Sequence, residues 1–214
     1  MPKQPLTPGE LARIETGFLP VAGPSVEIGV DGDGTACVDI EVGRWLDAAR
    51  HARDGLGLDF LDWLSAVDAP DGDPPGADVV LHVVGSAAMA GGPGLRRLLL
   101  RTRVADADPE LASLTGLWPG VAWHERETFE MFGISFAGFD DGTGRALRPL
   151  LLPDGFEGTP LRKSFVLTAR ASKPWPGAKE PGESAARSPG RRRTAPPGVP
   201  DPVTWGPHEP TAGG

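Results

Sequence analysis

The last 45 residues of this 214-residue chain limit what it can fold into. From Arg170 to Gly214 they include 10 prolines and 7 glycines, with almost no aliphatic side chains. Such a segment cannot bury enough apolar surface to offset the entropy lost on ordering. We therefore predict a disordered Pro/Gly-rich tail at 169–214. Residues 1–168 remain as one folded domain, long enough for a single hydrophobic core.

The first part of this domain carries clear start and turn signals. Thr7, Pro8 and Glu10 form a capping-box arrangement, which predicts a helix to about Phe18. Apolar residues alternate with polar ones over 26–30 and 36–40, on either side of an Asp-Gly-Asp-Gly sequence. This pattern predicts a β-hairpin.

The middle of the domain mixes helical and strand patterns. Apolar residues at helical spacing predict an amphipathic helix over 41–53 and a helical turn or two over 58–67. Residues 78–85 and 95–104 are rich in Val and Leu and are joined by small residues, which predicts a second hairpin.

Two more helical segments are predicted before the tail. The first is short, over 108–114, and the second runs from Val121 to Phe132 and stops at Gly133. The predicted fold class is therefore α+β, with a mainly antiparallel sheet of about four or five strands and helices on one face.

Composition excludes several kinds of function. Cys37 is the only cysteine, so the chain cannot contain a disulfide or a Cys-rich cluster or zinc site of its own. A formal charge of −8 argues against nucleic acid as the main partner. The longest apolar runs fall far short of the roughly 20 residues of a membrane-spanning helix. With no secretory pattern at the start of the sequence, we expect a cytoplasmic location.

Residues 123–133 concentrate charge among aromatic side chains. Glu125, Arg126 and Glu127 are consecutive, so on a helix they point about 100° apart. Because Trp123, Phe129 and Phe132 also favour burial, at least one of the three charges should be buried or directed at a partner. An ordinary surface helix with an apolar stripe explains the spacing equally well.

The segment 147–165 is apolar, rich in proline and ends in two cations. Leu150–Leu152 and Phe156 should fix it to the domain, and Arg162 and Lys163 then suit docking on an acidic or carbonyl-rich neighbour. A C-terminal loop whose polar groups are satisfied within the chain is the alternative.

Three sequence runs carry a family resemblance. They are E-R-E-T-F-E-M-F-G-I-S-F at 125–136, L-R-P-L-L-L-P at 147–153 and G-T-P-L-R-K at 158–163. Together they resemble the signature of the C subunit of NADH-quinone oxidoreductase, the thirty-kilodalton subunit family of respiratory complex I. The chain departs from that pattern at Phe139, at Ser164, and at Phe129, where the family commonly has tyrosine.

The resemblance implies a peripheral-arm subunit of a proton-translocating complex that passes electrons from NADH to quinone. Such a subunit is a non-catalytic part of the translocase and holds no cofactor or metal. It binds a D-like subunit and cluster-bearing subunits, which carry the flavin and iron–sulfur clusters, and it reaches the cytoplasmic face of the cell membrane through them. The residues that the resemblance assigns to the subunit interface are Glu125, Arg126, Glu127, Gly133, Arg148, Gly158, Pro160, Leu161, Arg162 and Lys163.

Other functions have weaker support. The family resemblance also fits the related subunit of a membrane-bound hydrogenase or of another donor-linked complex. An autonomous enzyme would need a site such as the zinc motif H-E-x-x-H, which fails after His124 because position 128 is Thr. The glycines at 91–94 lack the Lys-Ser/Thr of a phosphate loop, so we interpret them as a turn.

Overall fold

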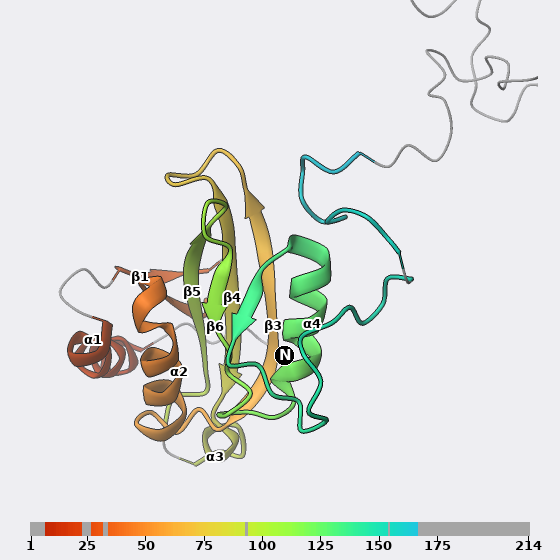
Figure 1. Ribbon diagram of the computed structural model, residues 1–214. Coiled ribbons are helices and arrows are strands. Elements are labelled where there is room, and N and C mark those ends of the chain that lie inside the picture. Colours follow the sequence, from red (N-terminus) through yellow and green to blue (C-terminus); the bar gives the residue numbers. More distant parts are fainter. Residues whose placement is uncertain (1–6, 23–26, 32–33, 93, 154, 167–214) are drawn as a thin grey trace, which may run out of the picture. The chain divides into compact units, whose positions relative to one another are not determined.

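The computed structural model describes residues 7–22, 27–31, 34–92, 94–153 and 155–166 (Figure 1). The predicted tail at 169–214 lies outside these residues. Helix α1 (Pro8–Ala22) begins with the predicted capping box: the N–H and hydroxyl of Thr7 each donate to the Glu10 carboxylate at 2.8 Å. The helix continues past Phe18, with Pro20 inside it.

Five strands form the main sheet, in the order β1-β2-β5-β4-β3. Strands β1 (Glu27–Val30) and β2 (Ala36–Asp39) are antiparallel, which confirms the first predicted hairpin. Strands β3 (Phe60–Ala69), β4 (Gly76–Val84) and β5 (Arg97–Ala105) follow as an antiparallel run, and β4 with β5 confirms the second hairpin. The pairing of β2 with β5 is parallel and was not predicted.

The helical turn predicted over 58–67 is wrong, because this segment is strand β3. A register shift between Leu61 and Trp63 marks a β-bulge, which places one extra residue in the strand. Leu61 pairs with Val83 and Leu64 with Leu81, so both face the core although they are three residues apart. The bulge thus gives the core-facing leucines of a strand the three-residue spacing that is typical of one face of a helix.

The short helix predicted over 108–114 is also wrong. Residues Glu110–Ala112 form strand β6, which pairs in parallel with β7 (Ser135–Ala137) as a second, two-stranded sheet. Leu111 is the one fully buried residue of this short strand. A three-residue strand whose partner lies 25 residues later, from Glu110 to Ser135, leaves no local pattern to recognise.

The remaining helices largely follow the sequence. The predicted 41–53 helix consists of a 3₁₀ turn, η1 (Val42–Arg44), and helix α2 (Trp45–Asp54). A short helix, α3 (Ser86–Met89), interrupts the connection between β4 and β5. Helix α4 (Val121–Phe132) has the predicted bounds and ends at Gly133 in the left-handed conformation, with φ of 74°. The left-handed backbone at position 133 suits glycine, because glycine has no Cβ to clash with the chain.

The core lies on one face of the main sheet. In β4, Ala77, Val79, Leu81 and Val83 are buried, and α1, α2 and α4 all contribute side chains to the same apolar cluster. Helix α4 packs against β3 and α1 packs against α2 (Figure 1). The opposite face carries two ion pairs, Arg101 with Asp39 and Arg103 with Asp78. The predicted α+β class is confirmed. No helix of the described segments is both long and apolar enough to cross a bilayer.

Candidate subunit interface

The three consecutive charges of α4 lie in three different environments. Glu125 is fully buried, Arg126 is half-buried and Glu127 is exposed. The expectation that at least one charge is buried or directed at a partner is therefore met by Glu125. Trp123, which was expected to be buried, is 61% exposed, and the Arg126 guanidinium lies 5.5 Å from its ring centre.

The Glu125 carboxylate faces the loop between β6 and α4. It accepts hydrogen bonds from the Ser113 hydroxyl and from the Leu114 N–H, both at 2.7 Å. Burial raises the pKa of Glu125 to about 7, and the two hydrogen bonds offset only part of that effect.

Arg126 and Glu130 attach the following segment, 147–153, to α4. Arg126 donates to the carbonyl of Arg148 at 3.2 Å and to that of Pro149 at 2.7 Å. The buried Glu130 carboxylate accepts the backbone N–H groups of Leu150, Leu151 and Leu152 at distances from 2.8 to 3.0 Å. These three amides lie outside any sheet, so they need an acceptor. We call residues 147–165, without residue 154, the docking arm.

The end of the docking arm is held by Arg162. Its guanidinium donates to the Phe132 carbonyl at 2.7 Å and contacts the carboxylates of Asp68 and Asp106, each at 3.0 Å. The Lys163 N–H donates to Asp68 at 2.7 Å. Burial alone would raise the pKa of Asp68, but the Lys163 N–H and the Arg162 guanidinium outweigh it and hold that pKa below its ordinary value.

Gly133 lets the docking arm approach the end of α4 closely, and Gly158 lets the arm pack on itself. A Cβ on Gly133 would lie 3.1 Å from the Thr159 methyl carbon, and a Cβ on Gly158 would lie 2.8 Å from the Phe165 ring. Gly158 also has φ of 102°, which L side chains rarely adopt. Beside this region the Leu161 N–H donates to the Met131 carbonyl at 3.1 Å.

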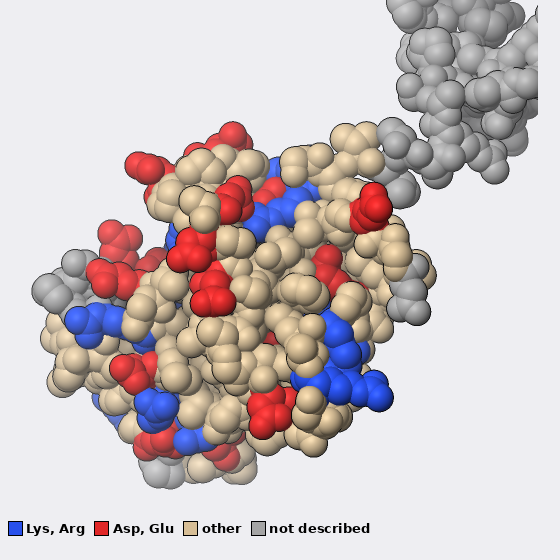
Figure 2. All heavy atoms as spheres, in the orientation of Figure 1, with Lys and Arg blue, Asp and Glu red and all other residues tan. Residues whose placement is uncertain are grey.

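Arg148 pairs with Asp141 at 2.6 Å, just before the docking arm turns along α4. Hydrogen bonds from the Thr143 hydroxyl, which has the larger effect, and from Arg148 lower the pKa of Asp141 to about 2. Lys and Arg side chains gather at the lower right of the face in Figure 2, beside the part of Figure 1 where the chain leaves β7 and passes α4.

Two of the positions at which the chain departs from the family pattern lie in different environments. Phe139 packs against the core and Ser164 is exposed.

The predicted interface residues thus come together along α4 and the docking arm, but in two groups. Glu125, Arg126 and Arg162 contact separate partners within the chain, and none of these contacts joins one of the three to another. The exposed residues of the predicted set are Glu127, Gly158, Leu161 and Lys163, and the side chains of Glu127, Leu161 and Lys163 form the outward-facing group. It also contains the large apolar side chains Trp123 and Leu151, which were expected to pack against the domain and instead are exposed.

Sequence reasoning also missed the role of Glu130. One usable signal was its spacing: Glu130 follows Arg126 by four residues, so both point to the same side of the helix. A second was the run Leu150–Leu152 next to prolines, whose amides cannot all join a sheet.

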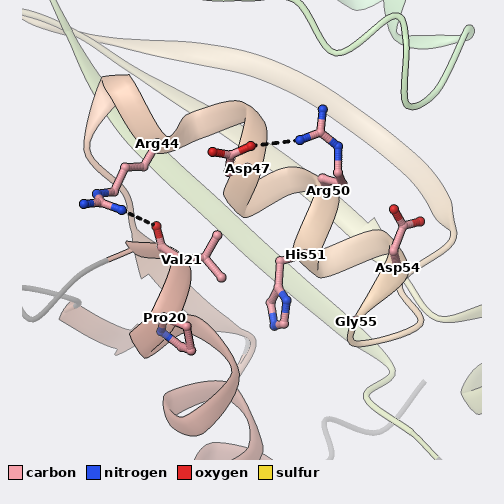
Figure 3. Close-up of a pocket in the computed structure, with 8 residues that line it drawn as sticks. All are labelled: Pro20, Val21, Arg44, Asp47, Arg50, His51, Asp54 and Gly55. Carbon is pink, nitrogen blue, oxygen red and sulfur yellow. Dashed lines mark hydrogen bonds and ion pairs between the residues drawn. The ribbon is translucent and has the colours of Figure 1, made fainter.

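A groove of about 410 Å³ lies between α1 and α2 (Figure 3). Its lining residues are Pro20, Val21, Arg44, Asp47, Arg50, His51, Asp54 and Gly55. Arg44 donates to the Val21 carbonyl and Arg50 pairs with Asp47 (Figure 3), while Asp54 pairs with Arg53 outside the groove. The groove therefore offers no converging set of catalytic groups. Within the described residues, no cluster of three or more His, Cys, Asp or Glu side chains could hold a metal ion.

Comparison with known proteins identifies the family of the chain. A family model described as "Respiratory-chain NADH dehydrogenase, 30 Kd subunit" matches residues 38–171. The NADH-quinone oxidoreductase C subunit of Roseiflexus sp. (strain RS-1) is 39% identical over 138 residues, which cover 64% of this chain and 72% of that protein. The protein of the same name from Azoarcus sp. (strain BH72) is 34% identical over 163 residues, which cover 74% and 78%.

Solved structures share the fold. The trypsin-resistant fragment (1-134) of Nqo5 aligns with a TM-score of 0.52 and 29% identity, covering 60% of this chain and 98% of the fragment. A chain of the membrane-bound sulfane sulfur reductase, an archaeal respiratory membrane complex, aligns with a TM-score of 0.57 over 74% of this chain and 86% of that chain, at 21% identity. From the family match and the identity to its relatives, the chain belongs to the family of the 30 kDa subunit of respiratory-chain NADH dehydrogenase.

Proposed function

We propose that this chain is the C subunit of a proton-translocating NADH-quinone oxidoreductase and acts as a scaffold without an active site of its own. One observation carries this proposal: Arg126, Glu130 and Arg162 are occupied in holding the docking arm in place, while large apolar side chains face outward. Trp123 is 61% and Leu151 63% exposed. Exposed apolar groups on a rigidly held surface are typical of protein–protein contacts.

The ten predicted interface residues then divide by role. Glu127, Leu161 and Lys163 would contact the partner directly, together with Trp123 and Leu151. The others would keep the surface in shape through contacts within the chain or through their backbone conformation, and these are Glu125, Arg126, Gly133, Arg148, Gly158, Pro160 and Arg162. A preformed surface loses little conformational entropy on binding, which favours stable assembly.

The proposed partners are a D-like subunit and the cluster-bearing subunits of the same complex. Iron–sulfur clusters would reside in those partners, because a cluster needs several cysteine ligands and this chain has only Cys37. The flavin would reside there as well. Membrane association on the cytoplasmic side would be peripheral and would occur through the partners. The scaffold would keep the cluster spacing and the quinone site fixed during electron transfer.

Alanine substitution of the outward apolar residues tests the proposal. Trp123→Ala and Leu151→Ala should each weaken assembly, by about tenfold for a hot-spot side chain, because they remove apolar contacts at the interface. The measurement is the amount of partner subunits that co-purify from membranes with a tagged chain. The melting temperature of the isolated chain should stay nearly unchanged, because both side chains are already exposed.

Val67→Ala is the matched control, since Val67 is 61% exposed and lies on β3, facing away from the core. This variant should assemble normally. Normal assembly of Trp123→Ala and Leu151→Ala would contradict the proposed surface. The identity of the co-purified subunits also distinguishes the two kinds of complex. Hydrogenase-type partners in place of NADH-side subunits would place the chain in a related donor-linked complex.

A further inference from the structure

Glu125 is a fully buried carboxyl group, and no cation among the described residues is paired with it. Its two hydrogen-bond donors, the Ser113 hydroxyl and the Leu114 N–H, are both uncharged. An ionised carboxylate in such a place keeps its hydrogen bonds but loses the hydration and the counter-ion that normally stabilise its charge.

The hydrogen bonds of Glu125 continue into a chain that joins three segments. The Ser113 hydroxyl also contacts the Thr115 hydroxyl at 2.9 Å. The Thr115 hydroxyl in turn accepts the Asp140 N–H at 3.2 Å. This chain connects α4, the loop after β6 and the segment after β7. The next residue, Asp141, pairs with Arg148 at the start of the docking arm.

We propose that Glu125 is a proton-linked latch, which holds the 113–115 loop and the 139–141 segment on α4 while its carboxyl is protonated and loosens them when it loses its proton to solvent. One proton is released each time the latch ionises. In the protonated form the carboxyl O–H donates to the Ser113 hydroxyl, which then donates to Thr115. In the ionised form the direction of these two hydrogen bonds reverses, but the negative charge would stay buried without a cation, and this cost favours the open state in which water reaches the carboxylate.

Charged groups on the surrounding elements do not neutralise this site. On α4, His124 and Arg126 flank Glu125 in sequence, but Arg126 donates to backbone carbonyls of the docking arm. From α2, the Arg53 guanidinium donates to the Leu117 carbonyl at 2.8 Å. Beyond Asp140, Asp141 is paired with Arg148. From β6, Glu110 is exposed.

The pKa of about 7 for Glu125 is consistent with this environment. Because the folded state holds this proton more tightly than an open state does, its contribution to stability is complete below the ordinary pKa. That contribution is lost as pH rises toward and through 7. If the docking arm is the subunit interface, as proposed above, the latch makes the shape of that interface sensitive to pH near neutrality.

Hydrogen exchange of the isolated full-length chain tests the latch without any partner subunit. The amides of Leu114, Thr115 and Asp140 are followed at pH 6 and pH 8, with exchange corrected for its intrinsic pH dependence. In the wild type their protection should fall by about tenfold between the two values, the change that linkage gives for pKa values of about 4.5 in the open state and about 7 in the closed state.

Glu125→Gln removes the titration and keeps the shape, so its protection should change less than about twofold between the two pH values. Glu127→Gln makes the same charge change at an exposed position two residues away and should behave as the wild type. Unchanged protection in the wild type between pH 6 and pH 8 would overturn the latch.

A direct measurement covers the case in which Glu125→Gln fails to fold. The side-chain ¹³C carboxyl signal of Glu125 in the wild-type chain should titrate with a midpoint near 7, whereas a midpoint below about 5 would overturn the proposal. Because no partner is present in either experiment, failure of the latch leaves the proposed scaffold role untouched. Normal assembly of the Trp123 and Leu151 variants, conversely, says nothing about Glu125.

Discussion

Arg162 links parts of the chain that are far apart in sequence. It lies at the end of the docking arm and contacts Asp68 at the end of β3 and Asp106 after β5, together with the last carbonyl of α4. Arg162 and Asp68 are only 11% and 7% exposed at their side chains, so water contributes little to stabilising either charge. Each charge therefore depends on the other.

Arg162→Ala should lower the free energy of unfolding by roughly 3 kcal/mol, because it leaves the Asp68 carboxylate buried without its cation. Chemical denaturation of the isolated chain measures this change. Arg145→Ala is the control, since Arg145 is an exposed arginine in the connection before the docking arm. Equal stability of the two variants would show that the Arg162 contacts are not formed in solution.

At the scale of the element, the docking arm has little regular structure, and its conformation comes from α4. Glu130 alone satisfies three consecutive backbone amides, those of Leu150, Leu151 and Leu152. A carboxylate can accept several hydrogen bonds at once, whereas an amide side chain has a single acceptor oxygen.

Glu130→Gln should therefore release the arm at 150–152 and leave the core folded. Limited proteolysis followed by mass spectrometry should show cleavage in this stretch that is about tenfold faster than in the wild type. Glu157→Gln makes the same chemical change at an exposed position in the arm and should be cleaved at the wild-type rate. If the two variants are cut equally slowly, Glu130 does not hold the arm.

Comparison of these elements with the sequence shows which features could be predicted. The capping box at Thr7 and the stop at Gly133 were predicted correctly, because each depends on residues within one helical turn. The bulge in β3 gave that strand an apolar spacing typical of a helix, so it was predicted wrongly. The parallel pairs β2–β5 and β6–β7 could not be predicted, because they depend on residues far apart in sequence. The same limit applies to the site: Arg162 reaches Asp68 across 94 residues, so its partner within the chain could not be predicted.

At the scale of the whole molecule, the shifted pKa values of its carboxyl groups have opposite effects on how stability changes with pH. The pKa of Asp68 is lowered in the folded chain, as is that of Asp141, to about 2. Below about pH 4 the unfolded chain takes up protons that these folded carboxylates do not, so stability is lost as pH falls through their folded pKa values. Glu125, with its raised pKa, reduces stability as pH rises toward 7.

The full chain should therefore be most stable between about pH 4 and pH 5, and less stable at both pH 2.5 and pH 8. Urea denaturation midpoints at these pH values measure the effect. Asp68→Asn should flatten the acid side of the profile and leave the alkaline side in place. A wild-type stability that rises steadily from pH 5 to pH 8 would contradict the assigned direction for Glu125.

The order of strands in the sheet also has consequences for how the chain folds. Strands β3, β4 and β5 pair with their neighbours in sequence, whereas Cys37 of β2 meets Leu99 of β5 across 62 residues. Closing so long a loop costs entropy before any contact is gained, so we expect the three-stranded meander to form first. Shortening a core side chain in the meander, as in Leu81→Ala, should then slow folding more than the same change in the hairpin, Val38→Ala. φ-values from stopped-flow kinetics measure this difference.

During synthesis this order sets a delay. The β1–β2 hairpin leaves the ribosome before the meander, yet it has no edge to join until β5 has followed. For that interval β2 presents an open strand edge, and in any chain that has lost the hairpin the nine residues of β5 do so. Such an edge can recruit a foreign strand. Once β2 has paired with β5, the hairpin thus also protects the sheet against aggregation.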